Sequence, residues 1–282
     1  MSYLEKIQYC HNAPLADYLP FTIAAQRYGY IRPDFAEQLQ QWDDIFQISA
    51  NEVSLKPHLA DYQQRSDAIA PVLAELHQAG IIDTWVDELY PVNHCYSEQG
   101  VMQMERAAAL YFGIRCYGVH MNGLVRKPDG IYVWIAVRAK DKPFFPGKLD
   151  QIVAGGQPVG INLMDNLLKE CQEEANIPTQ LASQAQARGY LNYQMETSRG
   201  IETGTLFNFD CWLPSDFVPV NTDGEVDSFE LVHIEELAVL TEQSDTFKDN
   251  CYLTNIDLLI RSGLITEQHK DYQAITQLLY SV

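Results

Sequence analysis

The chain has 282 residues, enough for one large domain or for two modest domains with ample cores. Its composition, 46% hydrophobic and 20% charged, is that of an ordinary globular protein. The formal net charge of −19 argues against nucleic acid and anionic lipid as partners, because no basic stripe is present to neutralise phosphates.

Cysteine usage and hydropathy give an expectation for the compartment. Six cysteines stand at scattered positions without paired spacing: Cys10, Cys95, Cys116, Cys171, Cys211 and Cys251. We expect them to be reduced and mostly buried in a cytoplasmic protein. Residues 1–11 are too polar for a signal peptide, and no apolar run approaches the roughly 20 residues of a membrane span. We therefore expect no membrane association.

Residues 1–115 are expected to form a small accessory α+β domain. Apolar spacing predicts helices over residues 35–46, 66–79 and 105–112, and Gly80 and Gly113 are placed to stop the last two. Strands are predicted over residues 53–55 and 85–92. Residues 116–282 are expected to form the second domain.

The second domain reads as a sheet with helices. Strands are predicted over residues 116–125, 131–138, 149–154, 189–196, 205–213 and 225–233. The turn at residues 128–130 makes the first two strands a hairpin. A short helix is predicted to open at Glu235, and two further helices are predicted over residues 246–262 and 266–280. The fold class is therefore α+β, a mixed sheet flanked by helices.

Residues 155–178, GGQPVGINLMDNLLKECQEEANIP, are predicted to form a glycine-rich turn and one helix. Asn162 is a good N-cap, while Asn176 and Pro178 are placed to end the helix.

Three glutamates carry the chemistry of this helix. Glu170, Glu173 and Glu174 stand at i, i+3 and i+4, so they share one helix face and repel one another. A hard divalent cation such as Mg²⁺ would relieve that repulsion, since it prefers carboxylate oxygen and often bridges to phosphates. The plainer interpretation is a solvated acidic surface.

This stretch resembles the signature of the Nudix hydrolases: Gly, five residues, Glu, seven residues, Arg-Glu, an apolar residue, any residue, Glu-Glu, any residue, Gly, and an apolar residue. The matching positions are Gly155, Glu170, Cys171, Glu173, Glu174 and Ile177. Three positions depart from the signature, since Ile161 stands where the first Glu is expected, Lys169 replaces Arg and Asn176 replaces Gly.

The blocks at residues 117–123, 146–150, 223–229 and 251–264 look like one Nudix subfamily, the thiamin-pyrophosphokinase-related one with an N-terminal accessory domain. The resemblance implies hydrolysis of a diphosphate linkage in thiamin diphosphate or its oxidised, damaged analogues, giving the monophosphate and phosphate. It implies Mg²⁺ as cofactor, with Mn²⁺ as the alternative, held by the three glutamates. A homodimer is one option for the assembly.

Further residues are candidates for the site. Glu225, after an Asp-Gly turn, is a candidate general base, and Gly155 and Gly156 let backbone approach phosphate. We expect the organic group of a small diphosphate substrate to meet His120 and Asn122, and its phosphates to meet Arg138 and Lys148; structural or surface roles are the competing interpretations.

Two other functions stay open. One is a pyrophosphatase for nucleoside-diphosphate-linked compounds such as ADP-ribose or a nucleotide sugar, because the signature addresses only the diphosphate. The other is a degenerate Nudix fold that binds a ligand without hydrolysing it, which the missing first Glu favours. A kinase is disfavoured, since the chain has no glycine-rich Gly-Lys-Ser/Thr loop.

Overall fold

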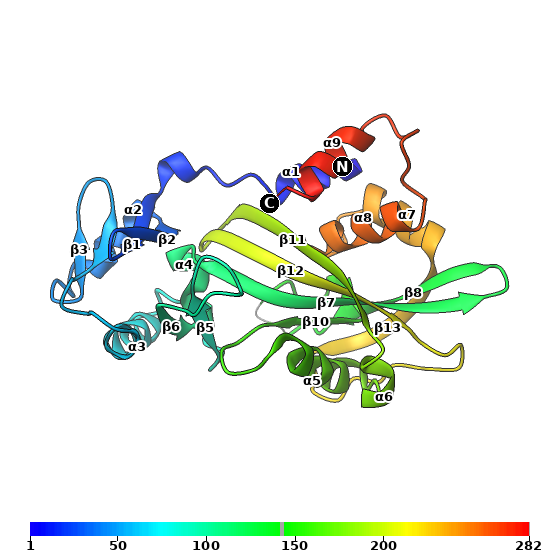
Figure 1. Ribbon diagram of the computed structural model, residues 1–282, viewed down its shortest axis with the longest axis horizontal. Helices are drawn as coiled ribbons and strands as arrows, with labels where there is room; N and C mark the ends of the chain where they lie inside the picture. The colour runs from blue at the N-terminus through cyan, green and yellow to red at the C-terminus, as the bar shows by residue number, and fades with distance from the viewer. Residues whose placement is uncertain (142–143, 282) are drawn as a thin grey trace.

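The computed structural model describes residues 1–141 and 144–281. Figure 1 shows two parts side by side, a smaller N-terminal part in blue and cyan and a larger part built on long strands. Within the described residues no helix is both long and apolar enough to cross a bilayer.

The smaller part is built on a four-stranded sheet of order β2-β1-β4-β3, formed by β1 (Leu19–Ile23), β2 (Gln26–Ile31), β3 (Phe46–Ile48) and β4 (Val53–Leu55). Around it lie η1 (Leu15–Asp17), α2 (Pro33–Leu39), α3 (Tyr62–Gln78), η2 (Arg106–Ala108) and α4 (Ala109–Phe112), with a separate ladder of β5 (Leu89–Val92) and β6 (Met102–Glu105). Phe112 anchors the core, because its ring lies 5.1 Å from the ring of Phe21 and 5.5 Å from that of Phe35.

The larger part is a seven-stranded mixed sheet whose path runs β11-β12-β7-β8-β13. Its strands are β7 (Arg115–Lys127), β8 (Gly130–Arg138), β9 (Leu149–Gln151), β10 (Val153–Gly156), β11 (Gln186–Thr197), β12 (Gly200–Trp212) and β13 (Val226–His233). The central strand β7 pairs in parallel with β12 along one edge. On its other edge it pairs first with β10 and then with β8, so the sheet forks there.

Helices cover both faces of this sheet (Figure 1). One face packs against α5 (Leu163–Ala175) and α6 (Thr179–Ala182), and the other against α7 (Ile234–Gln243), α8 (Cys251–Arg261) and α9 (Tyr272–Leu279). The predicted α+β class, a mixed sheet flanked by helices, is confirmed.

The first helix, α1 (Tyr3–Tyr9), packs with the last ones. Ile7 is fully buried in the core that α8 and α9 share. The buried Lys6 forms an ion pair with Asp245, and its ammonium lies 4.0 Å from the centre of the Tyr252 ring. Residues 3–9 thus pack on the far side of the domain boundary predicted between residues 115 and 116, and that boundary stays a prediction.

Most predicted elements of the larger part are confirmed, including the β7–β8 hairpin and α5 with its two asparagine ends. Several predicted bounds were wrong. The two C-terminal helices begin at Cys251 and Tyr272, later than the predicted residues 246 and 266. The helix predicted over residues 35–46 ends at Leu39, since Phe46 is a buried strand residue. Residues 105–112 form a 3₁₀ turn and one short helix, and the strand predicted over residues 85–92 begins only at Leu89. The glycine-rich turn is instead the end of strand β10.

We predict that Ile7→Ala lowers the free energy of unfolding by about 2–5 kcal/mol, because it removes a fully buried side chain from the shared core. Urea unfolding followed by circular dichroism measures the change. Gln8→Ala, on the exposed side of the same helix, is the matched control. A loss for Ile7→Ala no larger than that of the control contradicts the packing of α1.

Candidate active site

Helix α5 is held at both ends by local hydrogen bonds. The side chain of Asn162 accepts a hydrogen bond from the Asp165 N–H at 2.9 Å, and Asn176 ends the helix with a left-handed φ of 49°. Leu167 and Cys171 are fully buried against the sheet. These contacts fix the rotation of the helix and therefore the direction of its glutamates.

The three glutamates lie in different environments. Glu170 and Glu174 are buried and Glu173 is partly exposed. The Ala154 N–H of β10 donates a hydrogen bond to Glu174 Oε2 at 2.8 Å. Burial raises the pKa of Glu174 well above its ordinary value, and the Glu170 carboxylate raises it further. Burial also raises the pKa of Glu170, against the opposing charge of Lys169.

Lys169 bridges two of the three carboxylates. Its ammonium lies 3.3 Å from Glu170 Oε1 and 2.9 Å from Glu173 Oε2. It stands where the Nudix signature has Arg, and it keeps a cation there without the planar fork of Arg. One compact charge thus neutralises part of the cluster.

The two glycines of β10 make room for side chains. A Cβ on Gly155 would lie 2.3 Å from the carboxyl carbon of Glu170, and one on Gly156 would lie 1.8 Å from the Tyr90 hydroxyl. The expectation was that these glycines open the backbone to phosphate. In the structure they admit a carboxylate of α5 and a tyrosine of the smaller part.

A cavity of about 370 Å³ joins the two parts of the molecule at this point. Its walls include all three glutamates of α5 and, from the smaller part, Glu88, Tyr90 and Arg106. Among the described residues, seven acidic and four basic side chains line it: Glu88, Glu170, Glu173, Glu174, Glu202, Asp223 and Glu225 against Arg106, Arg138, Lys169 and Lys248. This volume is large enough for a small diphosphate compound.

The acidic wall has the carboxylate oxygens that a hard divalent cation takes as ligands, although those of Glu170, Glu173 and Glu174 do not all lie within 4.8 Å of one another in this structure. The carboxylates of Glu170, Glu173 and Glu174 line one cavity, and Glu225 acts electrostatically on Glu174. Such a cation would offset the repulsion that raises the pKa of the buried pair, and it takes oxygen ligands of this kind.

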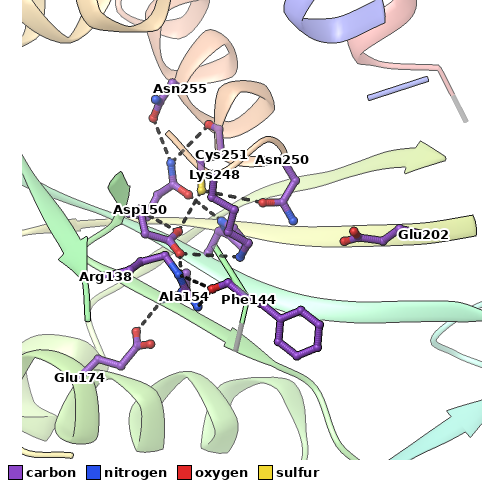
Figure 2. A network of polar contacts seen from close by, with 12 residues as sticks. Arg138, Phe144, Asp150, Ala154, Glu174, Glu202, Lys248, Asn250, Cys251 and Asn255 are labelled. Carbon is purple, nitrogen blue, oxygen red and sulfur yellow. Dashed lines mark hydrogen bonds and ion pairs between the residues drawn. The ribbon is translucent and has the colours of Figure 1, made fainter. Parts of the chain in front are cut away.

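A second polar network lies beside the glutamates (Figure 2). Asp150 is its centre, since one of its oxygens lies 2.9 Å from Arg138 Nη1 and 3.7 Å from Lys248 Nζ. Burial alone would raise the pKa of Asp150, but the two cations, together with His120, lower it to about 2. Arg138 also donates to the carbonyl oxygen of Phe144 at 3.0 Å.

The ligand atoms of His120, Asp150 and Cys251 lie within 4.8 Å of one another, yet the group does not suit a cation. Two cationic side chains already face Asp150, and the Cys251 thiol donates to it at 2.9 Å. Burial lowers the pKa of His120 to about 4 and raises that of Cys251, so both groups are neutral near pH 7. We interpret the group as a structural network.

The structure brings most of the candidate residues together. The cavity is lined by Gly155, Gly156, His120, Arg138, Glu170, Glu173, Glu174 and Glu225. Asn122 and Lys148 are not among its lining residues. Asn122 lies farther along β7, where its amide donates to Asp210 at 2.9 Å, and Lys148 binds the backbone carbonyl of Asp245.

Other lining residues were missed from the sequence. Lys248 and Glu202 come from regions without a recognisable spacing, so no signal in the sequence marked them. Glu88 and Tyr90 stand in the stretch of residues 85–92, where the sequence pattern predicted a strand but no site. Arg106 is held by Glu88, with 2.7 Å between Nη1 and Oε2.

Comparison with known proteins adds two kinds of match. A family described as a domain of unknown function (DUF4743) matches residues 2–116. Nudix hydrolase 24, chloroplastic, of Arabidopsis thaliana is 41% identical over 96% of this chain and 75% of its own length. Nudix hydrolase 20, chloroplastic, of the same plant is 40% identical over 98% of this chain and 77% of its own length.

Among solved structures, DR0079 from Deinococcus radiodurans matches with a TM-score of 0.43 and 20% identity, covering 61% of this chain and 98% of that one.

The names of the two plant relatives bear on the cellular compartment. The prediction of a cytoplasmic protein is wrong by this comparison, because both relatives are named as chloroplastic proteins. Reduced, scattered cysteines therefore did not identify the compartment.

We predict that Gly156→Ala destabilises the protein by about 1–3 kcal/mol, because the new methyl group would overlap the Tyr90 hydroxyl. Tyr90→Phe removes that oxygen, so the double variant should recover most of the loss. Thermal unfolding of the two single variants and the double variant measures the recovery. An equal loss in Gly156→Ala and in the double variant contradicts this contact.

We predict that Asp150→Asn lowers the free energy of unfolding at pH 7 by about 3–5 kcal/mol, since it leaves two cations without their buried partner. The folded-state pKa of Asp150 is depressed, so its stabilising contribution is present above the ordinary value of 3.8 and is lost as pH falls through about 2. Urea unfolding over this pH range measures the difference, with the exposed Asp227→Asn as control. A difference from wild type that does not shrink with falling pH rules out this role.

Proposed function

Because the chain belongs to the Nudix hydrolase family, we propose that it hydrolyses the diphosphate linkage of thiamin diphosphate, or of its oxidised analogues, to give the monophosphate and phosphate. The observation that supports hydrolysis is the single cavity into which the three glutamates of α5 project together with Glu225. The thiamin part of the proposal is supported by the flanking sequence blocks at residues 117–123 and 223–229.

In this proposal Glu170, Glu173 and Glu174 hold a divalent cation, Mg²⁺ or Mn²⁺. When bound, the cation supplies charge neutralisation at the diphosphate oxygens and a more acidic water. The chain supplies the orientation: the Ala154 N–H holds the Glu174 carboxylate, and the absence of a side chain on Gly155 leaves room for Glu170.

Glu225 is the proposed general base. It lines the same cavity, and its backbone is fixed because its N–H donates to Asp223 Oδ1 at 2.8 Å and its carbonyl accepts from the Ala139 N–H at 2.9 Å. A base on a fixed backbone, close enough to Glu174 to affect its protonation, suits the removal of a proton from an attacking water.

Lys248 is the proposed main phosphate contact. Its side chain is only 16% exposed, it lines the cavity, and its ammonium makes no hydrogen bond within residues 1–141 and 144–281. Arg138 is less free, because Asp150 and the carbonyl of Phe144 occupy its guanidinium. An ammonium with unused donors in a cavity is suited to phosphate oxygens. Asn122 and Lys148, away from the cavity, are not part of this proposal.

The smaller part is proposed as an accessory domain, residues 1–115, that closes one side of the site. Tyr90 and Arg106 from this part reach the cavity beside Gly156. Tyr117 and Tyr193 of the larger part line it as well, which gives the walls an aromatic character suited to a heterocyclic ring.

We predict that Glu173→Gln and Glu174→Gln each lower kcat/KM by roughly two to three orders of magnitude, because each removes a metal ligand worth several kcal/mol in the transition state. Glutamine keeps an acceptor for the Ala154 N–H, so the fold should survive; circular dichroism checks this. The exposed Glu37→Gln is the control. Near-normal turnover in both site variants excludes these residues from the reaction.

The substrate is tested by phosphate release with Mg²⁺ from thiamin diphosphate, its oxidised analogues, ADP-ribose and a nucleotide sugar, with added phosphatase for the last two. Turnover of the thiamin compounds at a higher kcat/KM supports the proposal. Turnover of the nucleotide compounds alone refutes the thiamin assignment while leaving the diphosphatase chemistry. No turnover of any compound refutes the hydrolase proposal.

A further inference from the structure

We infer that Glu202 is the specificity-determining residue of the site, and that it binds an amine-bearing or positively charged nitrogen heterocycle as the organic group of the substrate. This inference rests on the proposed diphosphatase function, because it takes the glutamates of α5 as the diphosphate end of the cavity. Nothing in the Nudix signature includes Glu202, which lies on strand β12.

Position is the first argument. Glu202 lines the same cavity as the glutamates of α5. Figure 2 shows Glu202 and Glu174 on opposite sides of the group formed by Arg138, Asp150 and Lys248. A diphosphate that lies between the α5 carboxylates and Lys248 therefore directs its organic group toward Glu202.

The hydrogen bonds of Glu202 leave one oxygen unused. The Tyr193 hydroxyl donates to Oε1 of Glu202, and Asn250 Nδ2 donates to that hydroxyl at 2.9 Å. Within the residues that the structure describes, Oε2 has no hydrogen-bond partner and Glu202 has no ion pair. The tyrosine and the asparagine thus orient the carboxylate, while its second oxygen remains available in the cavity.

Other acids of the cavity already have donors. Glu88 pairs with Arg106, Glu170 and Glu173 share Lys169, and Glu174 accepts from the Ala154 N–H. Burial raises the pKa of Glu202, while the hydroxyl of Tyr193 and the charges of Lys248 and Arg106 lower it. Within the described residues, Glu88, Glu170 and Glu173 each pair with a cation, whereas Glu202 has no ion pair and accepts only from a neutral hydroxyl.

In this inference, a group of the ligand donates the hydrogen bond that Glu202 Oε2 lacks among the described residues. A partly buried carboxylate is stabilised most by a charged or N–H donor, and such a hydrogen bond is stronger than one between neutral groups. An aromatic ring, that of Tyr193, lines the cavity beside Glu202. Gly204, next but one to Glu202 on the strand, has no side chain, so the Tyr193 ring lies where a Cβ would be, at 2.2 Å. Leu206 adds apolar surface to the same wall.

The test measures binding of thiamin monophosphate, the proposed product, so that it does not depend on turnover. Isothermal titration calorimetry with Mg²⁺ compares wild type with Glu202→Gln, which keeps an acceptor for the Tyr193 hydroxyl. We expect the Kd to rise about 10- to 100-fold, the effect of losing a hydrogen bond to a charged group. Inorganic pyrophosphate, which lacks an organic group, should bind both proteins alike.

Glu196→Gln is the matched control. Glu196 on the neighbouring strand β11 also accepts a hydrogen bond from a tyrosine hydroxyl, that of Tyr18 at 2.9 Å, but it is not among the lining residues of the cavity. This variant should bind thiamin monophosphate as wild type does. An equal loss in both variants shows a general effect of charge removal and overturns the inference.

A second ligand identifies the donor. In oxythiamin monophosphate a carbonyl replaces the exocyclic amine while the thiazolium charge remains. If Glu202→Gln weakens the binding of thiamin monophosphate alone, the amine is the partner; if it weakens the binding of both ligands, the charged ring is the partner.

Two outcomes overturn the inference. One is an unchanged affinity of Glu202→Gln for thiamin monophosphate, and the other is wild-type protein that binds pyrophosphate but not thiamin monophosphate. Absence of phosphate release from all diphosphates instead counts against the proposed function alone.

Discussion

The close approach at the end of strand β10 is the constraint on which the site depends. Gly155 and Gly156 have no side chains, so a carboxylate from α5 and the Tyr90 ring can both reach the strand. The neighbouring Ala154 N–H holds a second carboxylate in place. Strand β10, helix α5 and the strand that carries Tyr90 thus meet at residues 154–156. The two glycines therefore have a packing role, which differs from a direct contact with phosphate.

The cavity tolerates its many acids because most of them have a partner. Lys169 lies between Glu170 and Glu173 of its own helix. Asp150 forms ion pairs with Arg138 and Lys248, which line the cavity. Buried charges of this kind require a partner, since desolvation would otherwise favour their neutral forms. Within the described residues, the Lys248 ammonium makes no hydrogen bond and Glu202 has no ion pair, so these two groups are where a ligand has most to contribute.

The part of the site that depends on local geometry was predictable. Glu170, Glu173 and Glu174 share a helix face because of helical spacing alone, and Asn162 marks the helix start through its own side chain. Lys248 was not predictable, because only the long-range packing of the sheet against α8 brings it to the cavity. Predictions also failed where a pattern was ambiguous. The apolar spacing of residues 35–46 fits a single helix, but the structure has a helix, a turn and a strand there.

Helix α1 lies against α8 and α9, so the first and last elements of the chain complete one core. During synthesis, residues 3–9 leave the ribosome long before their partners exist. The apolar side of α1 has no native partner until α8 and α9 have been synthesised, and contacts of such long sequence separation slow folding. Synthesis of α8 and α9, more than completion of helix α5, therefore sets the moment at which the core around α1 can form.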